Sequence, residues 1–431
     1  MRIFLDSIGC RLNQSEIEYY ARQFRLAGHT LVAAADEADI SVINTCTVTH
    51  AADSDSRGKI RKAAKAGSNQ VVVTGCWSTL NPTQAVELPG VTRVIHNKDK
   101  QLLVPEILDI PSQDFDVEPI ARELIPGARL RTRAFIKAQD GCNNKCTFCI
   151  TTIARGPGMS RSPDEILYDI AAAVKNNGNQ AAKEIVLTGV HLGSWGKDLP
   201  GNQLLHDLIK LILQETDVPR MRISSLEPWD LDDEFFSLWK DKRLCRHLHL
   251  PLQSGSETVL RRMARNTTPK KFSHLVAAAR HACPDIAITT DLIAGFPGET
   301  DQEFSETMEF VQDMSFAGGH VFTYSSRPGT AAEKMANQVD YPIRKERNAK
   351  LRQLLAASGE SYQNKFLNQT LPVLWESVSR MDSDNWYLHG LSDNYLRIHA
   401  HADKNLWNQI TPVHLISKSE KGHFGIVQTP A

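Results

Sequence analysis

The stretch GCNNKCTFC, residues 141–149, holds three cysteines within eight residues: Cys142, Cys146 and Cys149. Thiolate is the soft ligand that zinc ions and iron–sulfur clusters select. A structural zinc site takes a closed set of four ligands, and the sequence around this loop offers no fourth cysteine or histidine. Because a four-iron cluster also usually takes four thiolates, three local thiols indicate a cluster with one iron left open. A zinc site and a Cys-x-x-Cys redox pair remain alternatives.

The loop lies inside a region of repeated strand–helix units. Short apolar or alternating runs bounded by turn residues are typical of β-strands, and the region holds six of them: RAFIKAQ, EIVLTGV, RMRISSL, HLHLPLQ, IAITTDLIAG and GHVFTYS. Helical patterns begin near Pro163, Gln203, Asp232, Pro269 and Thr300. These units predict a partial (β/α)6 barrel over residues 128–358. Because the cysteine loop follows the first strand, at the end where such barrels carry active sites, we expect a catalytic centre there.

Three more cysteines lie in the first hundred residues, and each follows a predicted strand. The strands are RIFLDS, ISVINT and VVVTG, and the cysteines are Cys10, Cys46 and Cys76. In a parallel α/β sheet the carboxyl ends of the strands share one edge, where ligands bind. Three unrelated buried thiols would be the plainer interpretation, because free cysteine is often a core residue. Their common position favours a second three-cysteine site, in an N-terminal parallel α/β domain over residues 1–110.

Polar residues and glycines stand at the ends of the central strands, where a small polar cofactor would need partners. We expect cofactor binding from Gly189, Glu227, Gln253, Ser254 and Asp291. For each residue alone, a satisfied structural hydrogen bond explains the position equally well. His247 and His249 are interpreted as polar strand positions rather than ligands. Cys245 and Cys283 are interpreted as ordinary buried thiols.

The last segment, residues 361–431, changes character. Short strand candidates spaced by polar turns predict a small antiparallel β-barrel. Such barrels often bind RNA by stacking bases on aromatic side chains. The segment carries as many acidic as basic residues, so RNA binding and a neutral packing module both remain open.

Composition sets outer limits on function. The chain has 431 residues, a net charge of −1 and 41% hydrophobic residues, as expected of an ordinary globular protein with two or three domains. The N-terminus lacks the pattern of a secretory signal, and no apolar run reaches membrane-spanning length. We therefore expect a cytoplasmic protein without membrane association, in which cysteine clusters hold metal rather than form disulfides.

Together these motifs resemble the methylthiotransferases of the radical S-adenosylmethionine superfamily over essentially the whole chain. The resemblance is carried by SIGCRLNQSEIE, VINTCTVTHAAD, VVTGC, GCNNKCTFCI, ARGPGMSRSP, LTGVHLG, HLHLPLQSGSETVLRRMAR, TTDLIAGFPGET and YSSRPGTAAEKM. The final segment, with GLSDNYLRIHA, looks like the family's C-terminal TRAM barrel. The residues around the first three cysteines look most like the branch that acts on threonylcarbamoyladenosine in tRNA.

The resemblance implies a mechanism with two 4Fe-4S clusters. The Cys142 loop would hold one cluster, whose open iron binds S-adenosylmethionine and yields a deoxyadenosyl radical. The triplet that begins at Cys10 would hold the second cluster and present sulfur to the substrate carbon, so all six cysteines are expected to be both metal-binding and catalytic. The reaction would convert a C–H bond of a modified adenosine in the tRNA anticodon loop into C–S–CH3. The two triplets would then have to face each other.

The same resemblance implies partners for the enzyme, and alternative functions remain open. An electron donor such as flavodoxin or ferredoxin, a sulfur source and tRNA are the expected partners. Another modified adenosine, or a residue of a ribosomal protein, could take the methylthio group instead. A zinc-bound RNA-binding module is the alternative outside enzymes.

Overall fold

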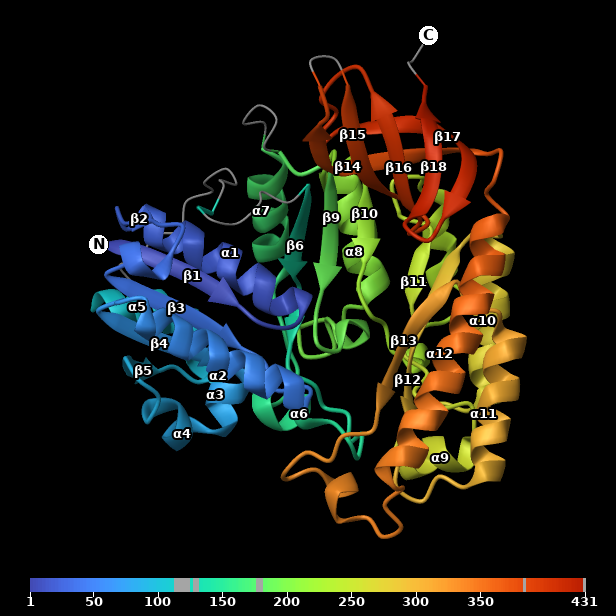
Figure 1. Ribbon diagram of the computed structural model, residues 1–431, viewed down its shortest axis with the longest axis horizontal. Helices are drawn as coiled ribbons and strands as arrows, with labels where there is room; N and C mark the ends of the chain where they lie inside the picture. The colour runs from blue at the N-terminus through green and yellow to red at the C-terminus, as the bar shows by residue number, and fades with distance from the viewer. Residues whose placement is uncertain (112–124, 127–131, 176–180, 383–384, 429–431) are drawn as a thin grey trace.

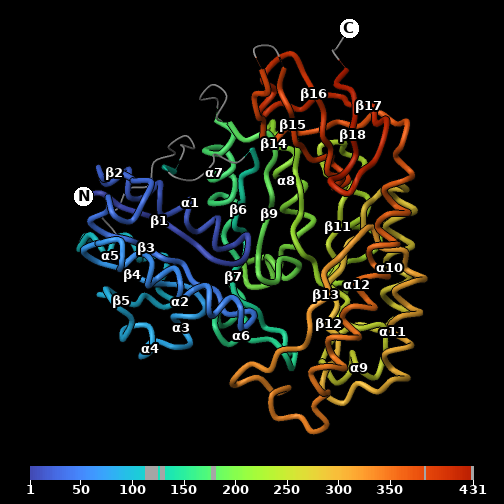
Figure 2. Tube along the Cα trace, in the orientation of Figure 1, coloured from blue at the N-terminus to red at the C-terminus, as the bar shows by residue number. Residues whose placement is uncertain are grey.

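The computed structural model describes residues 1–111, 125–126, 132–175, 181–382 and 385–428. Three parts are visible in Figures 1 and 2: an N-terminal α/β unit, a central curved sheet with helices outside it, and a C-terminal barrel. The predicted start of the central domain, residue 128, lies outside the described residues. None of the described helices combines the length and the apolar composition that a bilayer crossing requires.

The N-terminal sheet is parallel throughout, with the order β2-β1-β3-β4-β5. Its strands are β1 (Arg2–Ser7), β2 (Thr30–Leu31), β3 (Ile40–Thr45), β4 (Gln70–Gly75) and β5 (Val91–Val94). Its helices are α1 (Arg11–Leu26), α2 (His50–Lys65), α3 (Cys76–Leu80), α4 (Pro82–Val86) and α5 (Leu103–Leu108), with 3₁₀ turns η1 (Ala35–Glu37) and η2 (Asn97–Leu102). The chain adds β2 on one side of β1 and then adds β3, β4 and β5 on the other side. Parallel sheets of this kind bind ligands in the crevice at the point where the strand order reverses, here between β1 and β3.

Hydrophobic burial explains the arrangement of this unit. Every residue of β3, ISVINT, is buried, as expected for a parallel strand covered on both faces. Helix α1 buries Tyr20 and Phe24 against the sheet. Strands β2 and β5 were not predicted, because a two-residue strand and the four-residue run VTRV are too short to give a clear strand pattern of their own.

The central sheet contains the six predicted strands in chain order. They are β6 (Arg133–Lys137), β9 (Glu184–Thr188), β10 (Met221–Ile223), β11 (His247–His249), β12 (Ala287–Ala294) and β13 (Gly318–Thr323). They form two parallel three-stranded sheets, β6-β9-β10 and β11-β12-β13. Parallel bridges from Met221 to Leu244 and from Ser225 to His249 join the two. The result is the partial barrel that the sequence predicts.

Helices cover the outer face of this sheet (Figure 1). The central helices are α6 (Ile150–Arg155), α7 (Pro163–Val174), α8 (Leu205–Glu215), α9 (Glu257–Arg262), α10 (Pro269–Ala282), α11 (Asp301–Met314) and α12 (Tyr341–Asn364). Shorter elements are β7 (Gln139–Asp140), β8 (Met159–Ser160), η5 (Leu192–Ser194), η6 (Pro228–Asp230), η7 (Phe235–Lys240) and η8 (Ala331–Lys334). The helix predicted to begin near Asp232 is wrong, since only 3₁₀ turns form there. Three aromatic rings of η7, Phe235, Phe236 and Trp239, pack on one another instead.

The C-terminal strands close into a barrel of order β14-β15-β16-β18-β17. They are β14 (Thr370–Arg380), β15 (Trp386–Ser392), β16 (Arg397–Ala402), β17 (Ile410–Ser419) and β18 (Gly422–Val427). Four of the pairings are antiparallel, and β16 pairs in parallel with β18. Trp375 fills the interior, and its indole N–H donates to the Thr411 hydroxyl at 2.8 Å.

The barrel packs on the amino ends of the central strands. Arg222 of β10 donates to the carbonyl oxygens of Ser392 and Asp393, and Arg220 donates to that of Leu391. Both guanidiniums pair with the fully buried Glu184, at 2.6 and 2.8 Å. Burial opposes the charge of Glu184, but the two arginines hold its pKa at about 2. The barrel is thus fixed at the end opposite the carboxyl ends of the strands; β6 and β9 point away from it in Figure 1.

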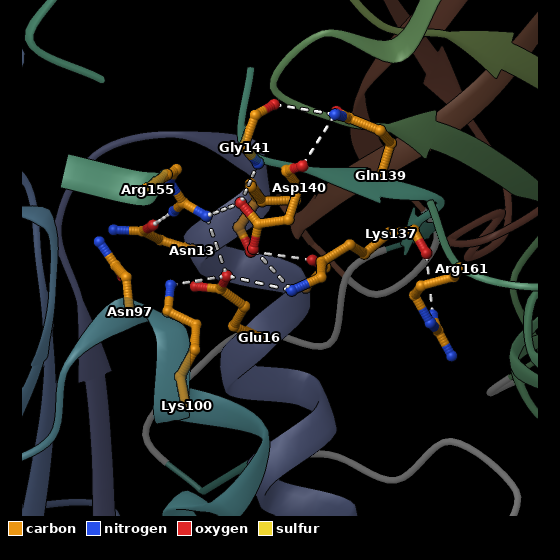
Figure 3. A network of polar contacts seen from close by, with 12 residues as sticks. Asn13, Glu16, Asn97, Lys100, Lys137, Gln139, Asp140, Gly141, Arg155 and Arg161 are labelled. Carbon is orange, nitrogen blue, oxygen red and sulfur yellow. Dashed lines mark hydrogen bonds and ion pairs between the residues drawn. The ribbon is translucent and has the colours of Figure 1, made fainter. Parts of the chain in front are cut away.

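A buried network of charged side chains fixes the N-terminal unit against the central sheet (Figure 3). Glu16 of α1 pairs with Lys100 at 2.8 Å and with Arg155 at 3.2 Å. Arg155, at the end of α6, also pairs with Asp140 at 2.7 Å. Lys137 of β6 pairs with Asp140 at 2.9 Å. Since isolated buried charges are costly, each part of the molecule needs the other to neutralise its own charges.

Replacing Arg155 tests this docking. Arg155→Met leaves two buried carboxylates without their shared partner, so the free energy of unfolding should fall by about 3 kcal/mol. Arg352→Met, on the exposed side of α12, is the matched control and should leave the unfolding midpoint unchanged. Urea unfolding of the two variants measures the difference. Equal midpoints would show that the network contributes no stability.

Candidate active site

The loop that carries the first cysteine triplet is shaped by glycine. Gly141 has a φ of +67°, and a Cβ there would overlap the carbonyl of Pro157. Only glycine tolerates both conditions without strain. The Cys142 N–H donates to the carbonyl of Gly156 at 3.0 Å, so the loop closes back on the segment after α6.

The sulfur atoms of this loop receive hydrogen bonds from the chain around them. The Asn144 N–H donates to Cys142 Sγ at 3.4 Å, and the Thr152 hydroxyl donates to Cys149 Sγ at 3.5 Å. Hydrogen bonds to sulfur tune the reduction potential of iron–sulfur clusters. The loop therefore presents sulfur atoms that already receive hydrogen bonds from the chain.

Arg265 places a buried positive charge at Cys146, the middle cysteine of the loop. Its Nη1 donates to Cys146 Sγ at 3.7 Å, and its Nη2 donates to Glu227 Oε2 at 2.6 Å. The guanidinium also lies over the ring of Trp229. Burial raises the pKa of Cys146 to about 11, and Arg265 opposes that rise. The arginine thus compensates the charge that a thiolate here would carry.

His191 is a neighbour of the loop that the linear sequence did not reveal. It follows β9, hydrogen-bonds to Cys142, and lies 2.5 Å from Asp230 through its Nε2. Burial alone would lower the pKa of His191, but the bonds to Asp230 and Cys142 raise it to about 9. Asp230 and Cys142 therefore favour the imidazolium form of His191 beside the triplet.

The structure places Cys10, Cys46 and Cys76 together at the carboxyl edge of the N-terminal sheet. Cys46 interacts electrostatically with both other thiols, and burial raises its pKa to about 11. A Cβ at Gly9 would lie 2.6 Å from Cys46 Sγ, so the turn before Cys10 approaches Cys46 closely. Gly75, with a φ of +97°, allows β4 to turn directly into Cys76 and α3.

Short contacts join the surroundings of the two triplets. Arg155 Nη2 donates to Asn13 Oδ1 at 2.8 Å, and the same oxygen lies 3.6 Å from Cys10 Sγ. Asn97 Nδ2 donates to the Ala154 carbonyl at 2.7 Å and lies 3.6 Å from Cys76 Sγ. Helix α6, which begins after Cys149, is thus held against the neighbours of the second triplet. The two triplets lie on either side of one interface.

The chemistry of the two donor sets fits iron–sulfur clusters. Each set offers three thiols with an arginine close by, Arg265 at the first and Arg155 at the second. In the described parts of the chain, no three His, Cys, Asp or Glu side chains are arranged to hold a single metal ion. A zinc ion with bonds of roughly 2.3 Å needs its sulfur atoms in such a tight group. Thiolates are the ligands that iron–sulfur clusters take, so the three thiols of each set fit such a cluster.

The five residues expected to bind a cofactor lie in different settings. Glu227 accepts a hydrogen bond from Arg265, which in turn contacts Cys146 of the first triplet. Gly189 lies so close to Gln139 that a Cβ on the glycine would be 3.0 Å from the side-chain oxygen of Gln139. Ser254 is buried against Thr307 of α11. Gln253 has a φ of +76° and exchanges backbone hydrogen bonds with β12. Asp291 pairs with two histidines on the inner face of the sheet. Cofactor binding by these residues stays a prediction.

Several residues of this site were missed in the sequence. They are Asn13, Asn97, Arg155, His191, Asp230 and Arg265. Asn13 and Arg155 stand within six residues of a cysteine and inside motifs quoted for the family resemblance, and these two signals could have pointed to them. The others reach the cysteines only through the fold.

Comparison with known proteins matches both the N-terminal unit and the central sheet to protein families. Residues 136–311 match the model of the radical SAM superfamily, and residues 2–96 match the uncharacterized protein family UPF0004. The chain is 34% identical to threonylcarbamoyladenosine tRNA methylthiotransferase MtaB of Bacillus subtilis, over 96% of this chain and 93% of that one. It is 35% identical to MtaB of Thermotoga maritima, over 86% of each chain. It is 32% identical to the tRNA-2-methylthio-N(6)-dimethylallyladenosine synthase of Acetivibrio thermocellus, over 87% of this chain and 81% of that one.

Solved structures support the fold. The radical S-adenosylmethionine methyltransferase TsrM of Kitasatospora setae superposes with a TM-score of 0.58 at 13% identity, covering 77% of this chain and 76% of that one. The radical enzyme OxsB reaches 0.51 at 12% identity, covering 84% of this chain and 56% of that one. With these matches over nearly its whole length, and with two cysteine triplets at one interface, the chain belongs to the methylthiotransferase family of radical S-adenosylmethionine enzymes.

Proposed function

We propose that this enzyme adds sulfur and a methyl group at a C–H bond of the threonylcarbamoyladenosine base of tRNA. The observation that carries the proposal is the meeting of the two cysteine triplets at one interface. One triplet alone would account for radical chemistry but would offer no second site from which sulfur could be delivered. Relatives that align with 86–96% of the chain bear the corresponding name.

We assign one 4Fe-4S cluster to each triplet and S-adenosylmethionine to the first: Cys142, Cys146 and Cys149, then Cys10, Cys46 and Cys76. When bound, these groups would supply three things: the deoxyadenosyl radical that removes the substrate hydrogen, the sulfur that is inserted, and the methyl group. Arg265 and Arg155 offset the charge of the thiolates. We propose that five residues at the strand ends contact S-adenosylmethionine or support the residues that contact it: Gly189, Glu227, Gln253, Ser254 and Asp291.

The remaining parts of the proposal concern organisation and partners. We place the domains at residues 1–110, 128–358 and 361–431; the matched segments 2–96 and 136–311 lie inside the first two. The enzyme acts in the cytoplasm with tRNA. It draws electrons from a donor such as flavodoxin or ferredoxin and takes sulfur from a separate source, because the reaction consumes both.

A second candidate function is methylthiolation of dimethylallyladenosine. Relatives bearing that name align with 87% of this chain at 32% identity, within the range of the first group. The chemistry at the cysteines would be the same for both substrates. The choice between them therefore depends on the surface that receives the substituent of the base.

Nucleoside analysis tests the substrate directly. In a strain that lacks the gene, tRNA should contain threonylcarbamoyladenosine without its methylthio derivative, while methylthio-dimethylallyladenosine stays at its normal level. Mass spectrometry of digested tRNA measures both nucleosides, and a plasmid-borne copy of the gene should restore the lost one. Loss of the dimethylallyl derivative instead would establish the second candidate.

Single-cysteine variants separate the two triplets. The anaerobically reconstituted protein should hold about eight irons, and Cys146→Ala or Cys46→Ala should each hold about four. Cys146→Ala should abolish cleavage of S-adenosylmethionine, because the cluster that reduces it is lost. Cys46→Ala should still cleave S-adenosylmethionine but should form no methylthio product.

The matched control is Cys283→Ala, which changes a buried thiol after α10. It should keep the full iron content and both activities. A colourless protein that contains zinc and no iron would support the RNA-binding module instead. Normal methylthiolation by Cys46→Ala would falsify the assignment of the second cluster.

A further inference from the structure

The inner face of the central sheet is polar, in contrast to its outer face. On the outer face, Ile223, Leu248 and Leu292 belong to the core that the helices cover. Side chains alternate along a strand, so the intervening residues point to the inner face. These are Glu184, Arg222, His247, His249, Thr289, Asp291 and His320. Such a surface suits a polar ligand rather than a hydrocarbon.

The N-terminal unit extends one residue into this space. Arg11 follows Cys10, and its Nη2 donates to the Tyr395 hydroxyl of the barrel at 3.2 Å. Burial lowers the pKa of Arg11 and the charges of Arg133 and Arg222 lower it further, while Tyr395 and the more distant Glu184 oppose the shift. Arg11 in turn acts on His247 and His320. The guanidinium therefore faces the same space as the inner side chains of β10, β11 and β13.

Most charges in this space are already paired. Glu184 is shared by Arg220 and Arg222, and Arg133 pairs with Glu376 at 2.7 Å. Asp291 lies 3.2 Å from His249 and 3.3 Å from His320. Glu184, Glu376 and Asp291 are therefore already engaged with cationic or histidine side chains.

Arg11 is the exception. Among the residues that the structure describes, its guanidinium has the Tyr395 hydroxyl as partner and no carboxylate. His320 is also open, with a side chain 75% exposed and its Nδ1 alone engaged. A half-buried arginine that bonds to a hydroxyl and lies near two other arginines is a site for an anion.

The two candidate substrates differ in this property. The threonylcarbamoyl substituent carries a carboxylate, whereas the dimethylallyl substituent is a hydrocarbon. A hydrocarbon on this surface would leave Arg11 desolvated and unpaired, which is unfavourable. Because Arg11 follows Cys10 in the chain, its backbone lies beside the site to which we assign sulfur delivery.

We infer that Arg11, with His320 as a second donor, binds the carboxylate of the threonylcarbamoyl group and so selects that adenosine over the dimethylallyl form. The inference rests on the proposed function and specifies its substrate contact. Arg11 is a specificity-determining residue here, and Asp291 orients His320 toward the same space.

A pair of RNA probes isolates the carboxylate. Anticodon stem-loops carrying threonylcarbamoyladenosine, or the analogue with a carboxamide in place of the carboxylate, bind to the reconstituted holoenzyme and are compared by fluorescence anisotropy. The wild type should prefer the acid by at least about tenfold, the value of a charge-assisted hydrogen bond. Arg11→Gln should lose most of this preference, and Arg11→Lys should retain part of it. Arg352→Gln, the matched surface control, should keep it entirely.

Each outcome bears on one level of the proposal. Full preference in Arg11→Gln, with normal iron content, overturns the inference and leaves the proposed function intact. So does a wild type that methylthiolates the acid RNA but binds acid and amide equally. A wild type that modifies only dimethylallyl RNA overturns the proposed function itself. If Arg11→Gln loses iron, His320→Gln takes its place: a reduced preference supports the inference, and an unchanged one overturns it.

Discussion

The buried ion network between α1, η2 and the central sheet is the constraint on which the rest of the molecule depends. Glu16 is 4% exposed, and burial of its charge is tolerated because Lys100 and Arg155 lie at ion-pair distance. Those partners come from different parts of the chain, so the network is satisfied in one relative placement only. That placement brings Cys10 and Cys76 to the end of α6.

Much of this arrangement could be predicted from the sequence, for a clear physical reason. Strands that end in cysteine are a local pattern, and parallel topology brings their ends to one edge, so the sequence alone is enough to group Cys10, Cys46 and Cys76. The six central strands were equally visible. Arg265 and His191 were not, because their roles arise from contacts between elements distant in sequence. The short edge strands β2 and β5 take their conformation from neighbours rather than from their own residues.

The sheet has two functional ends and a polar surface between them. The cysteine loop follows the carboxyl end of β6, whereas the barrel is anchored at the amino ends by Arg220 and Arg222. Between these ends, His249, Asp291 and His320 line the inner face. Of the two histidines interpreted from the sequence as polar strand positions, His249 pairs with Asp291, and His247 hydrogen-bonds to Thr289 and stacks on Tyr395.

The contact between Arg11 and Tyr395 has a consequence for how such enzymes can evolve. Tyr395 belongs to the barrel, stacks on His247 of the central sheet at 4.2 Å between ring centroids, and holds the residue beside Cys10. All three parts of the protein thus meet at one aromatic ring. The barrel is therefore not an interchangeable module: a chimera that receives the barrel of a relative without this ring would inherit a changed environment at the second triplet, even though every cysteine was kept.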